Sequence, residues 1–207
     1  LESLGLGDSR EIYVYGHSAG GQFTERFTWA HPDRVAAALV SATGSRCFPD
    51  EHFRYPYGIG PNYGSPAPEG VELLANLPDL LDTRLIYRVG EHDRDVLHTD
   101  FQRYPMAVYQ GLTRIHRTLN MYEAVNDVAP STGRASASLD HQVVVMEGIG
   151  HSGTSSPAEA SEFYRMMLAP KVESNVFVHP RFVAEPTAEP SRASLPGHVD
   201  QWQPGET

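Results

Sequence analysis

The strongest structural signal in this chain is the run Glu11-Ile12-Tyr13-Val14-Tyr15-Gly16-His17-Ser18-Ala19-Gly20-Gly21. Its first half is β-branched and aromatic and stops at a glycine, which is typical of a short buried strand. After the last glycine, apolar residues recur at helical spacing until Pro32, where a proline discourages further helix. The run therefore predicts a strand, a tight turn and a helix, and the spacing predicts that Phe23 and Phe27 are core residues facing the sheet.

Inside that run, Gly16-His17-Ser18-Ala19-Gly20 matches G-x-S-x-G, the pattern of a sharp, strained turn that exposes a serine hydroxyl. Small residues flank such a serine because the turn is tight, and Gly21 adds a further small position. An ordinary glycine-rich turn or a phosphate-binding turn is the alternative. The predicted strand before the pattern and the predicted helix after it favour a reactive serine.

A reactive serine needs two partners, because a hydroxyl must pass its proton to an imidazole that a carboxylate orients. Asp93 and His151 each follow a predicted strand. Since the carboxyl ends of parallel strands meet at one edge of a sheet, we expect Ser18, Asp93 and His151 to converge as nucleophile, acid and base. Asp95 is the rival acid, and a plain surface-loop histidine is the alternative for His151.

The other elements follow from apolar patterns along the chain. Strands are predicted at residues 35–40, 84–89 and 142–146, the first of them buried on both faces. Three-and-four spacing predicts one amphipathic helix over residues 105–129, and Pro157 suits the first turn of a last helix through residue 168. This alternation predicts an α/β fold with a mostly parallel sheet flanked by helices.

Composition limits the classes of function. The 207 residues carry 16 basic and 26 acidic side chains, a formal charge of -10 that disfavours nucleic acid as a partner. No apolar run is long enough to cross a bilayer, so we expect a soluble protein with no membrane partner. Cys47 is the only cysteine, which precludes an intrachain disulfide and leaves the compartment open.

The two ends of the chain differ from its middle. Residues 1–170 are predicted to form one domain, whereas residues 171–207 are rich in proline, glutamate and serine and are predicted to be an extended or disordered tail. The serine motif arrives soon after Leu1, so we expect upstream sequence to be missing, and any signal peptide with it.

Several other side chains were weighed for a role in the site. Residues 45–68 are predicted to be irregular, and their aromatic rings suit either an acyl or phenolic group or packing over the sheet. We expect His17 and Tyr57 to contact substrate. Cys47 is predicted to be a structural thiol.

Two sets of charged residues were set aside. The acidic loop after residue 90 lacks the glycine and terminal glutamate of a calcium-binding loop, so we expect no metal. Its members are Glu91, Asp93, Asp95, His98 and Asp100. Arg114 and Arg117 are predicted to lie on a solvated helix face, which leaves them outside the site.

Six stretches carry a resemblance to a known family. They are Gly16-His17-Ser18-Ala19-Gly20-Gly21, His31-Pro32-Asp33-Arg34-Val35, Tyr55-Pro56-Tyr57-Gly58, Gly90-Glu91-His92-Asp93, Gln110-Gly111 and Gly148-Ile149-Gly150-His151. Over residues 1–168 the chain resembles α/β-hydrolases related to poly(hydroxyalkanoate) depolymerases and feruloyl esterases. The resemblance implies the C-terminal part of an α/β-hydrolase fold, whose eight-stranded sheet would have about half of its strands before the serine.

The resemblance also implies a serine esterase that forms an acyl-enzyme intermediate, needs no cofactor and acts on a small-molecule or polymeric ester. Its oxyanion hole would use the Ala19 amide and a second donor from an upstream loop. That second donor has no counterpart in this sequence, and losing one donor typically slows such enzymes about a hundredfold to a thousandfold. A serine peptidase of the same fold and a catalytically inactive binding module remain the alternatives.

Overall fold

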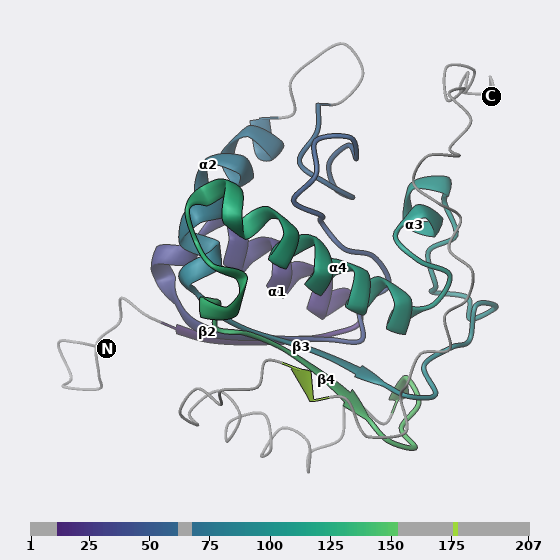
Figure 1. Ribbon diagram of the computed structural model, residues 1–207. Coiled ribbons are helices and arrows are strands. Elements are labelled where there is room, and N and C mark those ends of the chain that lie inside the picture. The colour runs from purple at the N-terminus through teal and green to yellow at the C-terminus, as the bar shows by residue number, and fades with distance from the viewer. Residues whose placement is uncertain (1–11, 62–67, 153–175, 178–207) are drawn as a thin grey trace, which may run out of the picture.

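The computed structural model describes residues 12–61, 68–152 and 176–177 (Figure 1). Its centre is a sheet whose strands lie in the order β1-β2-β3-β4-β5, and every neighbouring pair is parallel. The strands are β1 (Ile12–His17), β2 (Val35–Ser41), β3 (Arg84–Gly90), β4 (His141–Met146) and β5 (Val176–Phe177). The predicted strands and the predicted α/β class with a parallel sheet are confirmed.

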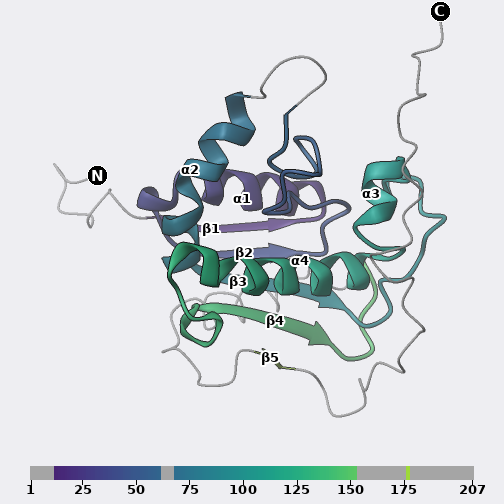
Figure 2. The ribbon, with the colours of Figure 1, turned by 45° about the horizontal axis from the view of Figure 1, so that its top comes forward.

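Helices connect the strands and cover one face of the sheet. They are α1 (Ala19–Ala30), α2 (Pro68–Asp82), α3 (Pro105–Tyr109) and α4 (Arg114–Val128), with short 3-10 turns η2 (Pro32–Arg34), η3 (Ala129–Thr132) and η4 (Ser136–Ser138). The sheet grows in one direction along the chain, so right-handed crossovers place the connecting helices on the same side. Figures 1 and 2 show α1, α2 and α4 on that side, and α3 beyond the carboxyl ends of the strands.

The main core lies between these helices and the sheet. Trp29 of α1 and Tyr87 of β3 are fully buried there, and the indole of Trp29 donates a hydrogen bond to the Leu73 carbonyl of α2. Leu39 and Ile86 point to the opposite face and are also fully buried. The central strands are therefore covered on both faces, as the apolar run at residues 35–40 predicts.

The predicted helix over residues 105–129 is wrong as a single element, because the structure breaks it between α3 and α4. Gly111 has a φ of +138°, and a Cβ there would lie 2.7 Å from the Cβ of His116. Thr113 then caps α4 by accepting a hydrogen bond from the His116 amide. Helical spacing continues across the break, so the pattern alone did not reveal it.

The prediction that Phe23 is a core residue is also wrong, since its side chain is 64% exposed. Phe27 is half-buried and stacks on Phe23 with 5.6 Å between ring centroids. The buried side of α1 holds Gly21, Thr24, Glu25 and Thr28 as well as Trp29, and the backbone approaches β2 closely at its start: a Cβ on Gly21 would lie 2.7 Å from the Ser41 carbonyl oxygen. Phe27 does pack against the main core, as predicted, so the apolar spacing is misleading only at Phe23.

Some predictions concern segments that the structure describes only in part. The predicted helix at residues 157–168 lies outside the described residues, as does the predicted tail apart from β5. Residues 45–61 are irregular, as predicted, and α2 occupies a segment for which no element was predicted. Within the described ranges, no helix has both the length and the apolar character that crossing a bilayer requires.

Candidate active site

Ser18 sits in a strained turn between β1 and α1. Its φ is 54°, a left-handed conformation that costs a non-glycine residue about 1–3 kcal/mol, and its amide donates to the Ser41 carbonyl of β2 at 2.9 Å. A Cβ on Gly16 would lie 2.1 Å from the Gly20 carbonyl oxygen, so only glycine lets strand and helix approach here. A Cβ on Gly20 would meet nothing within 4 Å, so the second glycine of the motif is not sterically required.

His151 links the serine to a buried carboxylate. Its Nε2 lies 3.2 Å from Ser18 Oγ, and its Nδ1 lies 2.8 Å from Asp93 Oδ2. A carboxylate only accepts hydrogen bonds, so this network assigns the proton to Nδ1 and lets Nε2 accept from the serine hydroxyl. The structure thus brings together the three side chains that the sequence places after separate strands.

The loops that carry the acid and the histidine are bonded to each other. The Glu91 amide donates to the Met146 carbonyl at 2.9 Å, and the His92 amide donates to the Ile149 carbonyl at 2.8 Å. In return, the Gly148 amide donates to Glu91 Oε2 at 2.9 Å. Because β3 and β4 are paired neighbours, these bonds make their two following loops one unit that fixes the distance from acid to imidazole.

Arg114 belongs to this site, so the prediction that Arg114 and Arg117 lie on a solvated helix face is wrong. Both side chains are at most 1% exposed. Arg114 Nη1 donates to Asp93 Oδ1 at 2.9 Å, and both guanidinium groups lie over the ring of Phe101. A sequence signal was available, because Arg114 and Arg117 are in helical phase with the buried Met121.

Two further imidazoles surround His151. The ring of His17 lies 4.7 Å from it and the ring of His98 lies 5.7 Å from it, measured between centroids. Burial, reinforced by the neighbouring imidazole of His151, lowers the pKa of His17 from 6.5 to about 4, so this ring is neutral at pH 7. The sequence predicted His17 as a site residue but gave no reason to choose His98 beyond its place after the acid.

The remaining candidates lie around this centre. The Ala19 amide begins α1, where the first amides of a helix have no intrahelical partner, so it is available beside Ser18. Asp95 is exposed and accepts a hydrogen bond from the Leu97 amide, whereas Asp93 bonds His151. No described contact joins Tyr57 to these residues, and its substrate role stays a prediction.

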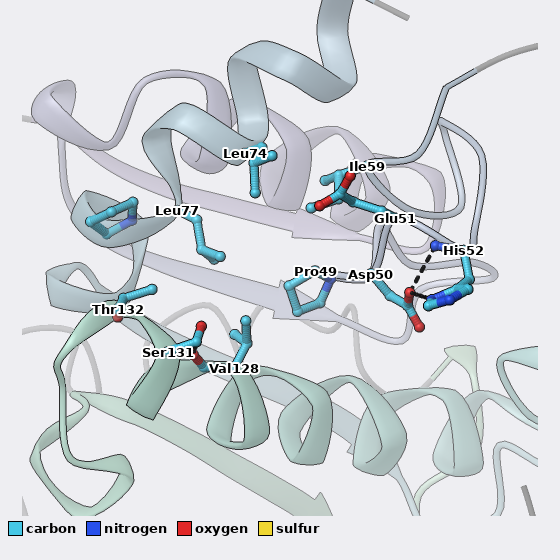
Figure 3. Close-up of a pocket in the computed structure, with 11 residues that line it drawn as sticks. Pro49, Asp50, Glu51, His52, Ile59, Leu74, Leu77, Val128, Ser131 and Thr132 are labelled. Carbon is cyan, nitrogen blue, oxygen red and sulfur yellow. Dashed lines mark hydrogen bonds and ion pairs between the residues drawn. The ribbon is translucent and has the colours of Figure 1, made fainter. Parts of the chain in front are cut away.

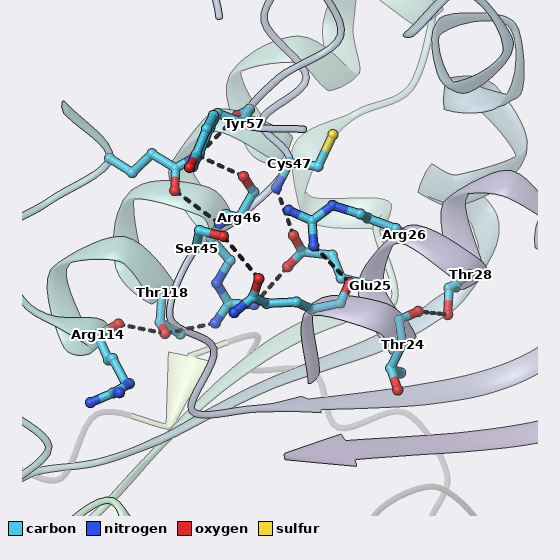
Figure 4. Close-up of polar contacts among 12 residues, drawn as sticks. Thr24, Glu25, Arg26, Thr28, Ser45, Arg46, Cys47, Tyr57, Arg114 and Thr118 are labelled. Carbon is cyan, nitrogen blue, oxygen red and sulfur yellow. Dashed lines mark hydrogen bonds and ion pairs between the residues drawn. The ribbon is translucent and has the colours of Figure 1, made fainter. Parts of the chain in front are cut away.

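The loop that follows β2 is anchored by a second buried ion pair, shown in Figure 4. Arg46 Nη1 lies 2.7 Å from Glu25 Oε2, and Arg46 Nη2 donates to Thr118 Oγ1 of α4 at 2.7 Å. The Gln110 side chain donates to the carbonyls of Arg46 and Tyr57. These bonds hold residues 45–57 against α1 and α4.

The aromatic and sulfur groups of this loop serve packing. Phe48 is buried, Phe53 and Tyr55 pack against the main core, and Phe48 meets Phe53 edge to face at 5.7 Å. Cys47 is fully buried, and burial raises the pKa of its thiol to about 12, as expected of a structural cysteine.

A cavity of about 470 Å³ opens between α2, the end of α4 and residues 49–52, as Figure 3 shows. Its apolar wall includes Ile59, Leu77 and Val128, with Asp50 and Glu51 on the loop. It includes none of the residues that bond Ser18, so it is separate from the candidate active site. Within the part of the chain that the structure describes, no cluster of histidine, cysteine and carboxylate side chains is arranged to hold a metal.

No family model and no curated protein matches this chain. Two solved structures match it well. Poly(aspartic acid) hydrolase-1 from Sphingomonas sp. KT-1 is 29% identical, with a TM-score of 0.60 over 76% of this chain and 54% of that one. LpqC, a poly(3-hydroxybutyrate) depolymerase from Bordetella parapertussis, is 24% identical, with a TM-score of 0.58 over 78% of this chain and 56% of that one.

The chain spans just over half the length of each of these two structures. Both likenesses show the predicted α/β-hydrolase fold, and the first, at 29% identity, supports the predicted relationship to hydrolases of that fold. The chain has an α/β-hydrolase fold.

Proposed function

We propose that this chain is a serine hydrolase that cleaves carboxylic ester bonds through an acyl-enzyme intermediate. The observation that carries the proposal is the continuous line of hydrogen bonds from Ser18 through His151 to Asp93. A carboxylate that holds Nδ1–H leaves Nε2 free to accept the serine proton, which is the arrangement that activates a hydroxyl for attack on a carbonyl.

The proposed reaction has two halves. Ser18 Oγ attacks the carbonyl carbon as its proton moves to His151 Nε2, and the Ala19 amide donates to the developing oxyanion. The carbon–oxygen bond to the alcohol then breaks, and His151 returns the proton to the leaving group. A water molecule next gives a proton to the same nitrogen and attacks the acyl carbon. The bond from that carbon to Ser18 Oγ then breaks, and His151 returns the proton to Oγ, which releases the acid and restores the Ser18 hydroxyl.

The proposed substrate is a small-molecule or polymeric ester with a neutral or hydrophobic acyl group, as in the depolymerases and feruloyl esterases that the chain resembles. His17 is a proposed contact for it, because its neutral ring lies against His151. Amide cleavage is the second candidate, since the similar hydrolase from Sphingomonas acts on poly(aspartic acid), which is a polyamide.

The test is labelling with a fluorophosphonate, followed by mass mapping of the modified residue. We expect labelling at Ser18 and its loss in Ser18→Ala. Ser131→Ala is the control, because Ser131 carries an exposed hydroxyl beside the separate cavity and lies outside the proposed site. No labelling of the folded wild-type chain at Ser18 would contradict the proposal and favour a catalytically inactive binding module.

A matched pair of chromogenic substrates separates the two candidates. An ester and an anilide with the same acyl group differ only in the bond that is cleaved. We expect the ester to turn over and the anilide to remain intact; comparable turnover of the anilide would assign the chain to amide hydrolysis.

A further inference from the structure

Arg114 and Arg117 lie one turn apart on α4 and are equally buried, but they use their N–H groups differently. Arg117 donates to backbone carbonyls in three separate loops. These carbonyls belong to Gly44, Gln102 and Gly111. Among the described residues, the side chain of Arg114 makes its hydrogen bond to Asp93, while its buried Nε and Nη2 have no hydrogen-bond partner. Arg117 therefore holds three loops together, whereas Arg114 donates its side-chain hydrogen bond to the carboxylate of Asp93.

Asp93 depends on these protein donors because its side chain is fully buried. Its Oδ2 meets His151 Nδ1 at 2.8 Å, and its Oδ1 meets Arg114 Nη1 at 2.9 Å. The terminal torsion of an aspartate is broad and roughly two-fold, so one hydrogen bond alone does not fix the plane of the carboxylate. Two charge-assisted bonds on different oxygens fix it, with Oδ2 held toward the imidazole.

The guanidinium of Arg114 is itself held in place. It lies over the ring of Phe101 at 4.8 Å, and that ring is only 4% exposed. Arg117 lies over the same ring at 4.1 Å. A cation against an aromatic face is favourable, and more so when both are removed from water. The ring thus fixes the position from which Arg114 reaches Asp93.

We infer that Arg114 is a positioning residue for the reaction: its guanidinium fixes Asp93 Oδ1 so that Oδ2 keeps His151 aligned with Ser18. The inference rests on the proposed function. The competing explanation is that Arg114 only neutralises a buried carboxylate, in which case its loss would lower stability without slowing the activation of Ser18 in the folded chain.

The experiment measures the rate of fluorophosphonate labelling of Ser18 together with the thermal unfolding midpoint. We expect Arg114→Met to slow labelling by about tenfold to a hundredfold, because one charge-assisted hydrogen bond is removed. Arg114→Lys should restore part of the rate, since an ammonium keeps the charge and a donor but loses the planar group that stacks on Phe101. Arg46→Met is the matched control: it breaks the other buried arginine–carboxylate pair, and its folded fraction should label within about threefold of wild type.

A double-mutant cycle tests whether Arg114 acts through Asp93. In the Asp93→Asn background, adding Arg114→Met should change the labelling rate by less than about threefold, since the carboxylate that Arg114 positions is gone. The double variant also leaves no uncompensated buried charge, so it serves if Arg114→Met alone does not fold. A further tenfold loss in that background would overturn the inference.

A spectroscopic readout does not depend on the probe. A ring proton shared between imidazole and carboxylate gives a low-field proton resonance, which we expect in wild type and Arg114→Lys and expect to be lost or shifted in Arg114→Met. An unchanged resonance and an unchanged labelling rate in folded Arg114→Met would refute the positioning role of Arg114 but not the proposed function. Absence of Ser18 labelling in folded wild type would refute the proposed function and this inference with it.

Discussion

Among the residues that the structure describes, two arginine–carboxylate pairs are buried, one in the candidate active site and one beneath the loop that follows β2. Asp93 and Arg114 are 2.9 Å apart, and Glu25 and Arg46 are 2.7 Å apart. All four side chains are at most 3% exposed. By charge, distance and burial the two pairs are nearly equivalent.

They differ in what the second carboxylate oxygen meets. Glu25 Oε1 accepts a hydrogen bond from the Cys47 amide at 2.8 Å, so this pair ends on the backbone. Asp93 Oδ2 meets an imidazole whose other nitrogen reaches the half-exposed Ser18. The comparison teaches that burial of an ion pair does not identify a reactive site. What identifies it is the group that the second carboxylate oxygen contacts.

The largest expected effect comes from Asp93→Asn. An amide in place of the carboxylate favours the wrong imidazole tautomer, and in serine hydrolases this lowers the rate about ten-thousandfold. We expect a loss of labelling of Ser18 on this order with the chain still folded by circular dichroism. Labelling within tenfold of wild type would erase the distinction between the two pairs.

Glu25→Gln should lower stability, as Asp93→Asn also does by leaving Arg114 uncompensated, but it should leave the labelling rate of the folded chain unchanged. Breaking a buried pair by neutralising one partner leaves Arg46 uncompensated and costs about 3–5 kcal/mol in the free energy of unfolding. Denaturant unfolding measures this loss, and labelling of Ser18 in the folded fraction serves as the second readout. A slowed labelling rate at unchanged stability would mean that this pair, too, acts on the serine.

The sequence predicts three residues of the candidate site but not the arginine that holds its carboxylate. Ser18, Asp93 and His151 were predictable because each follows a strand, and parallel strands bring their carboxyl ends to one edge. Arg114 was not chosen, because arginine is usually exposed and its buried position depends on a carboxylate 21 residues earlier in the chain.

The limits on predicting the fold are equally local. The break between α3 and α4 depends on the backbone conformation of Gly111, which side-chain spacing does not report. Phe23 was misassigned to the core because the buried side of α1 is centred on Gly21, which approaches β2 closely, and on Glu25, which pairs with Arg46. In α2, the buried Leu73 and Leu77 lie at helical spacing, which favours a helix. Pro78 also lies inside this helix, and a proline usually interrupts one.

His17, which lies beside His151 in the candidate active site, should make the stability of the chain depend on pH. Its pKa falls from 6.5 to about 4 on folding, so between these values the unfolded chain binds more protons and native stability decreases as the pH is lowered. The contribution is at most about 1.4 kcal/mol per pH unit in that window and vanishes above pH 6.5. We expect His17→Gln to flatten this part of the stability profile, measured by thermal unfolding at several pH values. An equal slope in both proteins would contradict the assigned burial.

The smallest expected effect concerns Cys47, whose thiol reactivity reports on the pair of Glu25 and Arg46. Because burial raises the pKa of its thiol to about 12, the native chain should not react measurably with a disulfide reagent at pH 8. Full reaction is expected in denaturant. Glu25→Gln should increase the reactivity of the thiol without unfolding the chain, since the negative charge of Glu25, which helps to raise the thiol pKa, is removed. Rapid reaction of native wild type would show that this region is open.

Because each strand pairs with its neighbour along the chain, the described sheet can add strands in the order in which the ribosome makes them. His151 is synthesised 133 residues after Ser18 and is positioned by the strand that pairs next to the acid loop. Until that strand docks, Ser18 is an unactivated alcohol like any other. Under the proposed function, the nascent polypeptide therefore carries no activated nucleophile until β4 pairs with β3.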